Sequence, residues 1–285
     1  MIKTIKYLIQ AIFIYLFFLI GKILGIKISR KIFSFLFKKL GPTIKSKNAI
    51  NRNLLKFSNN LSKTEINKIC ENMWSNYGMT FIEYIFLKNL RKSNLHIRIN
   101  GEEKLEKIRN DNKPVIFVSG HFANFELMSM EISKKNIKLA TIYRPLNNFF
   151  LNPLMEYLRR NFVCKNQIKK GRLGVKQSIE FLNKNHSIAL MIDQRVSEGE
   201  RIKFFNDEAY TTTLPAQLAL KYNLKIFPIF IERQNDDFFN IEVYDAILPH
   251  NYNNKIEISK KLNEVLEKMI LRNPNQWIWT HDRWK

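Results

Sequence analysis

The chain has 285 residues, enough for one sizeable α/β domain with an attachment segment, or for two small domains. Its 47 Lys and Arg residues outnumber 25 acidic residues, so the formal net charge is +22, which indicates an anionic partner such as nucleic acid, a membrane surface or an acidic protein. The 22 Phe residues, the absence of zinc-ligand spacing around the two cysteines and the even spread of charge argue against a nucleic-acid binder.

The N-terminal residues are strongly apolar. Residues 7–20 carry no charge, and the apolar stretch resumes after Lys22, so that a helix here approaches the thickness of a bilayer. In residues 26–40, basic residues interrupt the apolar ones, which is typical of a helix in the lipid headgroup region; among them are Arg30, Lys31, Lys38 and Lys39. We predict a membrane-attachment segment at 1–40, with spanning slightly favoured over an interfacial position, and a second domain at 41–285. A buried core helix and a cleaved signal peptide are less favoured alternatives.

Strands and helices are expected to alternate over most of the remaining chain. Ser62 and Glu65 form a capping-box pattern that opens a helix. Short apolar runs predict strands at 95–99, 114–119, 139–143, 187–193, 225–232 and 240–247. Helical spacing predicts helices at 124–135, 149–160, 173–183, 214–222 and 256–271. This order predicts an α/β fold with a largely parallel, mixed sheet flanked by helices.

One motif carries candidate chemistry, the turn from Gly120 to Glu126 that follows the buried strand 114–119. Ligands bind at the carboxyl ends of strands in open α/β sheets. His121 and Glu126 can meet only if His121 lies on the turn and Glu126 in the first helical turns. We therefore expect Glu126 to hydrogen-bond one imidazole nitrogen while the other accepts a proton from an alcohol. A histidine at a strand end with no catalytic role is the plain alternative.

The other histidines are less promising, because His96 lies in an alternating strand and His186 and His250 lie in polar turns. His281 belongs to the C-terminal aromatic cluster 277–284, for which a structural role is favoured over a lipid-facing rim.

These residues resemble a known family. The HFANFE turn at 121–126, the YRPLNN block at 143–148 and Asp193-Gln194 are similar to blocks of the bacterial lipid A biosynthesis acyltransferases of the lauroyl/myristoyl type. That family belongs to the lysophospholipid acyltransferase superfamily, and the resemblance covers nearly the whole chain. It implies a glycerolipid acyltransferase-like fold in which 41–285 is the acyltransferase domain.

The resemblance also implies partners and roles. The acyl donor would be an acyl carrier protein thioester, the acceptor a hydroxyl of a lipid A precursor, and the site the cytoplasmic face of the bacterial inner membrane. His121 would be the general base and Glu126 its partner, with no metal and no cofactor. The residues implied in substrate binding or in holding the site are Arg144, Asn147, Asp193, Gln194 and either Arg159 or Arg160.

The sequence is also compatible with two other functions. One is the same chemistry on a lysophospholipid or another glycolipid, and the other is a basic membrane-surface binding protein without catalysis. Acyl-chain length, the acceptor hydroxyl and the oligomeric state have no signal in the residue pattern.

Overall fold

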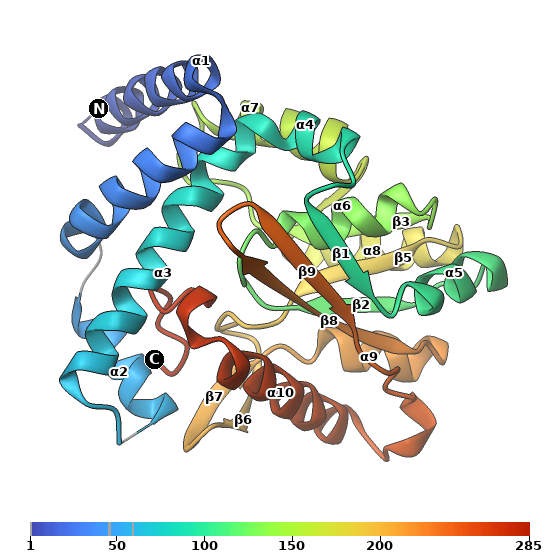
Figure 1. Cartoon of the computed structure of the whole chain (residues 1–285). Helices are drawn as coiled ribbons and strands as arrows, with labels where there is room; N and C mark the ends of the chain where they lie inside the picture. Colours follow the sequence, from blue (N-terminus) through green and yellow to red (C-terminus); the bar gives the residue numbers. More distant parts are fainter. Residues whose placement is uncertain (1, 45–46, 59) are drawn as a thin grey trace.

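The computed structural model describes residues 2–44, 47–58 and 60–285. A seven-stranded sheet with the order β1-β9-β8-β2-β5-β3-β4 forms its centre (Figure 1). Every neighbouring pair in this sheet is parallel except β8 and β9. The strands are β1 (Ile97–Asn100), β2 (Ile116–Ser119), β3 (Leu139–Tyr143), β4 (Asn166–Lys169), β5 (Ser187–Met191), β8 (Ile226–Gln234) and β9 (Phe238–Val243). The predicted α/β fold with a largely parallel sheet is confirmed.

Helices cover both faces of the sheet, which explains why its central strands are apolar over most of their length. On β2, Ile116 and Val118 belong to one core cluster, whereas Phe117 between them belongs to another. The first cluster includes residues of α2 (Lys47–Phe57), α3 (Lys63–Glu83), α8 (Arg172–Asn183), α9 (Leu214–Tyr222) and α10 (Lys255–Arg272). The second includes residues of α4 (Leu87–Lys92), α5 (Glu102–Asp111), α6 (Glu126–Lys134) and α7 (Asn152–Leu158).

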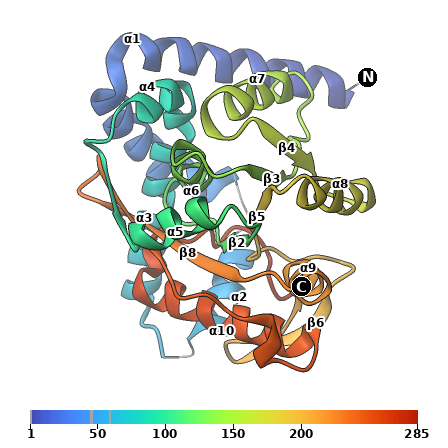
Figure 2. The ribbon, with the colours of Figure 1, turned by 90° about the vertical axis from the view of Figure 1, so that its right-hand side faces the viewer.

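Helix α1 (Ile2–Ile44) is bent at Gly25, whose φ of 77° lies outside the helical region. Its first part lies beside α7 along one side of the molecule (Figures 1 and 2) and exposes many large apolar side chains. By length and composition, residues 2–43 are long and apolar enough to cross a membrane, and 17% of the most apolar window is buried. Its second part packs on α3, where Phe33 and Phe37 contact Phe81.

Arg30 corrects one expectation for this second part of α1. The sequence pattern predicts that Arg30 lies on a helix in the lipid headgroup region, but its side chain is buried and its Nε lies 2.6 Å from Oε1 of Glu83. In the sequence, a buried arginine that pairs with another helix gives the same pattern of apolar and basic residues as an arginine on the surface. The spacing of these residues therefore does not distinguish the two cases.

Local signals place the element ends well but miss three strands. The capping box is formed, with Glu65 N donating to Ser62 Oγ and Ser62 N donating to the Glu65 carboxylate. Strand β4 and the hairpin of β6 (Glu200–Phe204) and β7 (Asp207–Thr211) were not predicted, because their sequences mix polar and apolar residues over only four or five positions. The helix expected at 149–160 begins at Asn152 and continues into a π-helical turn at Arg159–Val163.

Candidate active site

A cleft of about 650 Å³ lies at the carboxyl edge of the central strands. Strands β2 and β5 are neighbours, and Ser119 pairs with Met191 at their ends. The chain continues for two residues beyond each of these positions to His121 and Asp193, so the sheet register brings these two side chains together. The cleft is also lined by residues of α1, α3, α7 and the loop that follows β3.

His121 is hydrogen-bonded to Asp193 through two groups. Its Nδ1 lies 2.7 Å from Asp193 Oδ1, and its backbone N–H donates to Oδ2 at 2.8 Å. Because Nδ1 is occupied, Nε2 is the ring nitrogen left for a substrate in the cleft. The His121 side chain keeps 18% exposure and packs edge-on against the ring of Phe125. This geometry is that of an imidazole whose orientation is fixed by a carboxylate.

Asp193 is buried behind His121 and does not line the cleft. Burial by itself would raise the pKa of its carboxyl, but the attraction of His121 and the hydrogen bonds from His121 and Trp277 outweigh it, so the pKa is lowered. Trp277 Nε1 donates to Oδ2 at 2.9 Å. The Asp193 carboxylate is therefore ionised at neutral pH and has three donors around it. Of the two roles implied for Asp193, binding substrate and holding the site, this placement favours the second.

Glu126 does not occupy the position expected for it. It lies in the first turn of α6, where its Oε1 accepts hydrogen bonds from Tyr84 Oη at 2.7 Å and from Arg159 Nε at 2.8 Å. The predicted hydrogen bond from Glu126 to His121 is thus wrong, because Asp193 holds the imidazole and Arg159 holds Glu126. The reason is that His121 leaves the sheet at β2 directly beside the end of β5.

The Glu126–Arg159 pair is nearly buried, with side-chain exposures of 8% and 11%. Burial disfavours the Arg159 cation, but the carboxylate of Glu126 and the hydroxyl of Tyr84 overcome this effect and raise its pKa. Burial, followed by the neighbouring Glu126 charge, raises the pKa of Tyr84 well above its ordinary value. Arg159 opens the π-helical turn, a feature often found at functional sites. The guanidinium is thereby held over the rings of Tyr84 and Tyr143 at the cleft wall.

Four of the other predicted site residues line the cleft, and one does not. Arg144, Asn147 and Gln194 line the cleft, and the first two are exposed at its rim. Arg159 lines it as well, whereas Arg160 is exposed and lies outside its lining. The structure therefore distinguishes between the two neighbouring arginines that the sequence left equivalent.

One side of the cleft is apolar. Ile14 and Phe18 come from α1, Phe81 from α3, and Leu154 and Met155 from α7. The rings of Phe18 and Phe81 lie 5.1 Å apart between centroids. The cleft thus joins a hydrocarbon-like wall, built partly from the exposed helix α1, to a rim with basic side chains.

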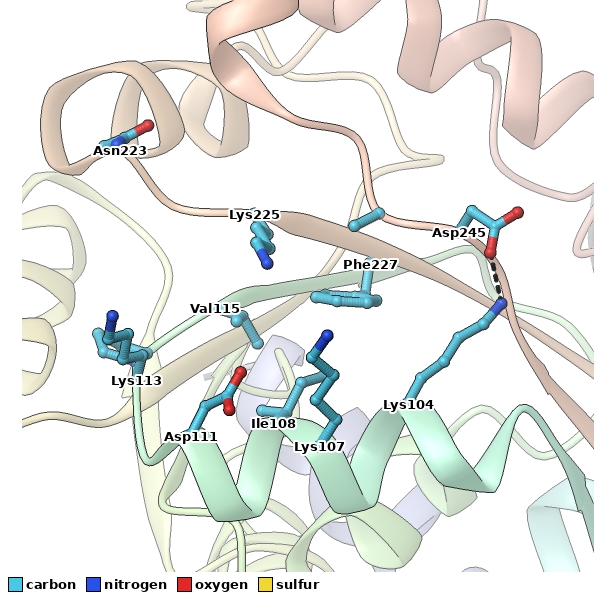
Figure 3. Close-up of a pocket in the computed structure, with 12 residues that line it drawn as sticks. Lys104, Lys107, Ile108, Asp111, Lys113, Val115, Asn223, Lys225, Phe227 and Asp245 are labelled. Carbon is cyan, nitrogen blue, oxygen red and sulfur yellow. Dashed lines mark hydrogen bonds and ion pairs between the residues drawn. The ribbon is translucent and has the colours of Figure 1, made fainter.

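A second, smaller cavity of about 290 Å³ lies at the other end of the sheet (Figure 3). Val115 and Lys225, which precede β2 and β8, line it together with Phe227 and Lys107. Its charged residues are four lysines and two aspartates, and one of these lysines, Lys104, is paired with Asp245 at 2.7 Å. It holds neither histidine nor arginine, so we place the candidate active site in the larger cleft.

The sequence matches the family model for bacterial lipid A biosynthesis acyltransferases over residues 2–285. The chain belongs to this family. Lipid A biosynthesis acyltransferase 2 of Shigella flexneri is 24% identical over 230 residues, which cover 76% of this chain and 71% of that protein. The family membership makes the protein an acyltransferase of lipid A biosynthesis, a class associated with membranes.

Two further relatives come from Escherichia coli strain K12. The lipid A biosynthesis palmitoleoyltransferase is 24% identical over 66% of this chain, and the lauroyltransferase is 23% identical over 65%. These two alignments span 61% and 60% of the relatives, or about three fifths of their length. The crystal structure of the 1-acyl-sn-glycerophosphate acyltransferase PlsC from Thermotoga maritima is 14% identical, with a TM-score of 0.43 and coverage of 89% of this chain and 99% of that chain.

Several residues of this acyltransferase's site were missed from the sequence. Tyr84 has no local signal, because it follows an ordinary packing helix. Trp277 was noted only as part of an aromatic cluster, and its bridge to Phe122 places it beneath the motif. His281 lines the cleft and accepts a hydrogen bond from Arg195 N at 3.0 Å, and burial lowers its pKa. Lys170 lines the cleft near Arg144, and burial together with that charge lowers its pKa.

Proposed function

We propose that the protein transfers a fatty acyl chain from acyl carrier protein to a hydroxyl of a lipid A precursor. The transfer is a late, secondary acylation at the cytoplasmic face of the bacterial inner membrane. The observation that carries this proposal is the His121–Asp193 pair in a cleft that has both an apolar wall and a basic rim. The names of the curated relatives support a lipid A type of acceptor.

His121 acts as the general base in the proposed mechanism. Its Nε2 takes the proton of the acceptor hydroxyl as the oxygen attacks the carbonyl carbon of the thioester. Asp193 keeps Nδ1 protonated and stabilises the imidazolium that forms. The tetrahedral intermediate then collapses, the carbon–sulfur bond breaks, and the imidazolium returns the proton to the departing thiolate. The proton taken from the acceptor hydroxyl thus leaves on the thiol, and no covalent intermediate forms on the protein.

Arg159 is the proposed donor to the developing oxyanion. Its Nε and Nη2 are bonded to Glu126, and the guanidinium still faces the cleft. A preorganised cation in a largely buried position stabilises charge that appears only in the transition state. In this role Glu126 holds Arg159, and it contributes to catalysis as a positioning residue, not as the partner of the base.

The two substrates fit different parts of the cleft. The acyl chain lies along the apolar wall between α1 and α3, where burial of each methylene contributes about 0.8 kcal/mol. Arg144 and Asn147 at the rim, with Gln194 in the cleft wall, bind the sugar and phosphate groups of the acceptor, for which the planar guanidinium of Arg144 is suited. The net charge of +22 favours approach to anionic lipid and to the acidic carrier protein.

An acyl-transfer assay tests this function directly. Membranes that contain the protein receive labelled acyl carrier protein thioester with either a lipid A precursor or a lysophospholipid. We expect transfer to the lipid A precursor, loss of that transfer in His121→Ala, and retention in His186→Ala, a control in the turn before β5 that lies outside the cleft. A clear preference for lysophospholipid would overturn the acceptor. No transfer to either lipid would leave a membrane-surface binding protein as the better account.

A further inference from the structure

A buried charged cluster connects helix α1 to the turn that carries His121. At its centre is Glu83, the last residue of α3, whose side chain is fully buried. Arg30 of α1 donates to its Oε1 at 2.6 Å, and Arg233 of β8 donates to Oε1 at 2.5 Å and to Oε2 at 3.0 Å. Burial opposes ionisation of Glu83, but the two guanidinium groups outweigh this and lower its pKa.

The same carboxylate also holds the catalytic turn. Asn124, three residues after His121, donates its Nδ2 to Glu83 Oε2 at 2.8 Å. Thr80, one helical turn before Glu83, donates to the carbonyl oxygen of Ala123 at 2.9 Å. Ala123 has a φ of 44°, a left-handed conformation that a non-glycine residue keeps only when its surroundings impose it. Glu83 and Thr80 supply part of this constraint.

The arrangement exceeds what stability alone requires. A buried ion pair is weak evidence for stability, because well-packed apolar side chains of similar volume often serve as well. Here the hydrogen bonds of Glu83 are divided among α1, β8 and the turn that carries His121, so that one side chain contacts all three. The next residue, Tyr84, bonds to Glu126 at the far end of that turn. The end of α3 thus holds the turn at both Asn124 and Glu126.

We propose that Arg30, Glu83 and Asn124 are positioning residues that make the geometry of the His121 turn depend on the docking of α1 against α3. The proposal rests on the proposed role of His121 as the base. When Arg30 leaves Glu83, the carboxylate loses one of its two guanidinium partners and turns further toward Arg233, which weakens its hold on Asn124. The turn then loosens and His121 is held less firmly, whereas the acceptor-binding residues Arg144 and Asn147 at the rim of the cleft keep their place.

The test compares Arg30→Met, Asn124→Ala and the double variant in the full-length protein, with Arg30→Lys as a milder change. Ser34→Ala is the matched control, because Ser34 also joins α1 to α3, through a hydrogen bond of 2.7 Å to Ser75, without any link to the turn. Two experiments are made: steady-state kinetics give kcat and KM for acyl transfer, and hydrogen exchange gives the rates of the backbone amides at 121–127.

We expect each single variant to lower kcat roughly two- to thirtyfold at unchanged KM, and to speed exchange at 121–127. The double variant should lose no more kcat than the worse single variant, because the residues act through the same carboxylate. Arg30→Lys should give a smaller loss, and Ser34→Ala should leave kcat and this exchange unchanged.

Additive losses in the double variant would overturn the proposal, and so would normal exchange at 121–127 in both Arg30 variants. If the wild-type protein transfers no acyl chain, the proposed function fails on that result. The exchange rates still show whether the turn depends on α1. Failure of the proposed function and failure of this coupling therefore give different results.

Discussion

Glu126 and Arg159, which lie 33 residues apart, form a nearly buried ion pair at the wall of the cleft, with Nη2 and Oε1 separated by 2.7 Å. Tyr84 shares the same carboxylate oxygen. The acid of the His-x4-Glu motif therefore holds an arginine, and the imidazole is held by another acid, Asp193. The two carboxylates therefore have different roles, and substitution of each one has a different expected result.

The ion pair predicts strong coupling between Glu126 and Arg159. Removal of one partner leaves a charge uncompensated in a largely buried site, which costs about 3–5 kcal/mol of unfolding free energy. We expect Glu126→Gln and Arg159→Met each to lower the melting temperature, and the double variant to lower it no further than the worse single variant. Thermal unfolding in detergent measures all three. Additive losses would contradict the pairing, and an unchanged melting temperature in Glu126→Gln would contradict the cost assigned to an uncompensated Arg159.

Acid conditions should destabilise the fold through its buried carboxylates. The pKa of Glu83 is lowered from 4.5 in the folded protein, because its two arginines and Asn124 outweigh the effect of burial. A carboxyl whose folded pKa is depressed contributes stability that is present above its ordinary value of about 4.5 and is lost as the pH falls through the lower, folded value. Asp193 adds a contribution of the same sign.

The corresponding measurement is the melting temperature as a function of pH below 4.5, for the wild type and for Glu83→Gln. We expect a shallower dependence in the variant, since one of the groups that must be protonated on acid unfolding is gone. Glu106→Gln, an exposed position on α5, serves as the control and should keep the wild-type slope. An identical slope in Glu83→Gln would refute the assigned linkage.

Ala123 offers a test of the strained turn. Its φ of 44° is unfavourable for residues with a Cβ atom, and its side chain is buried. Ala123→Gly relieves this strain but increases the entropy of the unfolded chain, so we expect a change within about 1 kcal/mol. Ala123→Val adds a branched side chain at the same φ and should destabilise by roughly 1–3 kcal/mol. Equal melting temperatures for the two variants would show that the turn does not need this conformation.

The sequence predicted six of the nine strands in the described part of the chain, and the turn, but not the contacts between distant residues. Alternation and apolar runs located β2 and β5, the motif pointed to His121, and the family resemblance pointed separately to Asp193. Their contact depends on β5 lying next to β2 although 72 residues separate the two side chains, and the strand order is not encoded in local periodicity. Spacing along the helix therefore suggested the nearer acid, Glu126.

Arg30 and Tyr84 illustrate the same limit. A buried arginine paired with a residue 53 positions away produces the same one-dimensional pattern as an arginine that faces lipid headgroups. Tyr84 follows α3 with no cap, glycine or charge pattern to mark it, and its role appears only through its contact with Glu126. The ends of helices and strands depend on residues close in sequence, whereas these side-chain partners depend on how the elements pack.

The central claim is that Asp193 orients the base and that Glu126 does not. The most direct measurement is the kcat of Asp193→Asn for acyl transfer to the lipid A precursor, with folding checked by thermal unfolding. Asparagine keeps the shape but removes the charge that stabilises the imidazolium, so we predict a fall in kcat of roughly 10²–10⁴-fold with little change in KM. A folded Asp193→Asn protein with wild-type kcat would contradict the account.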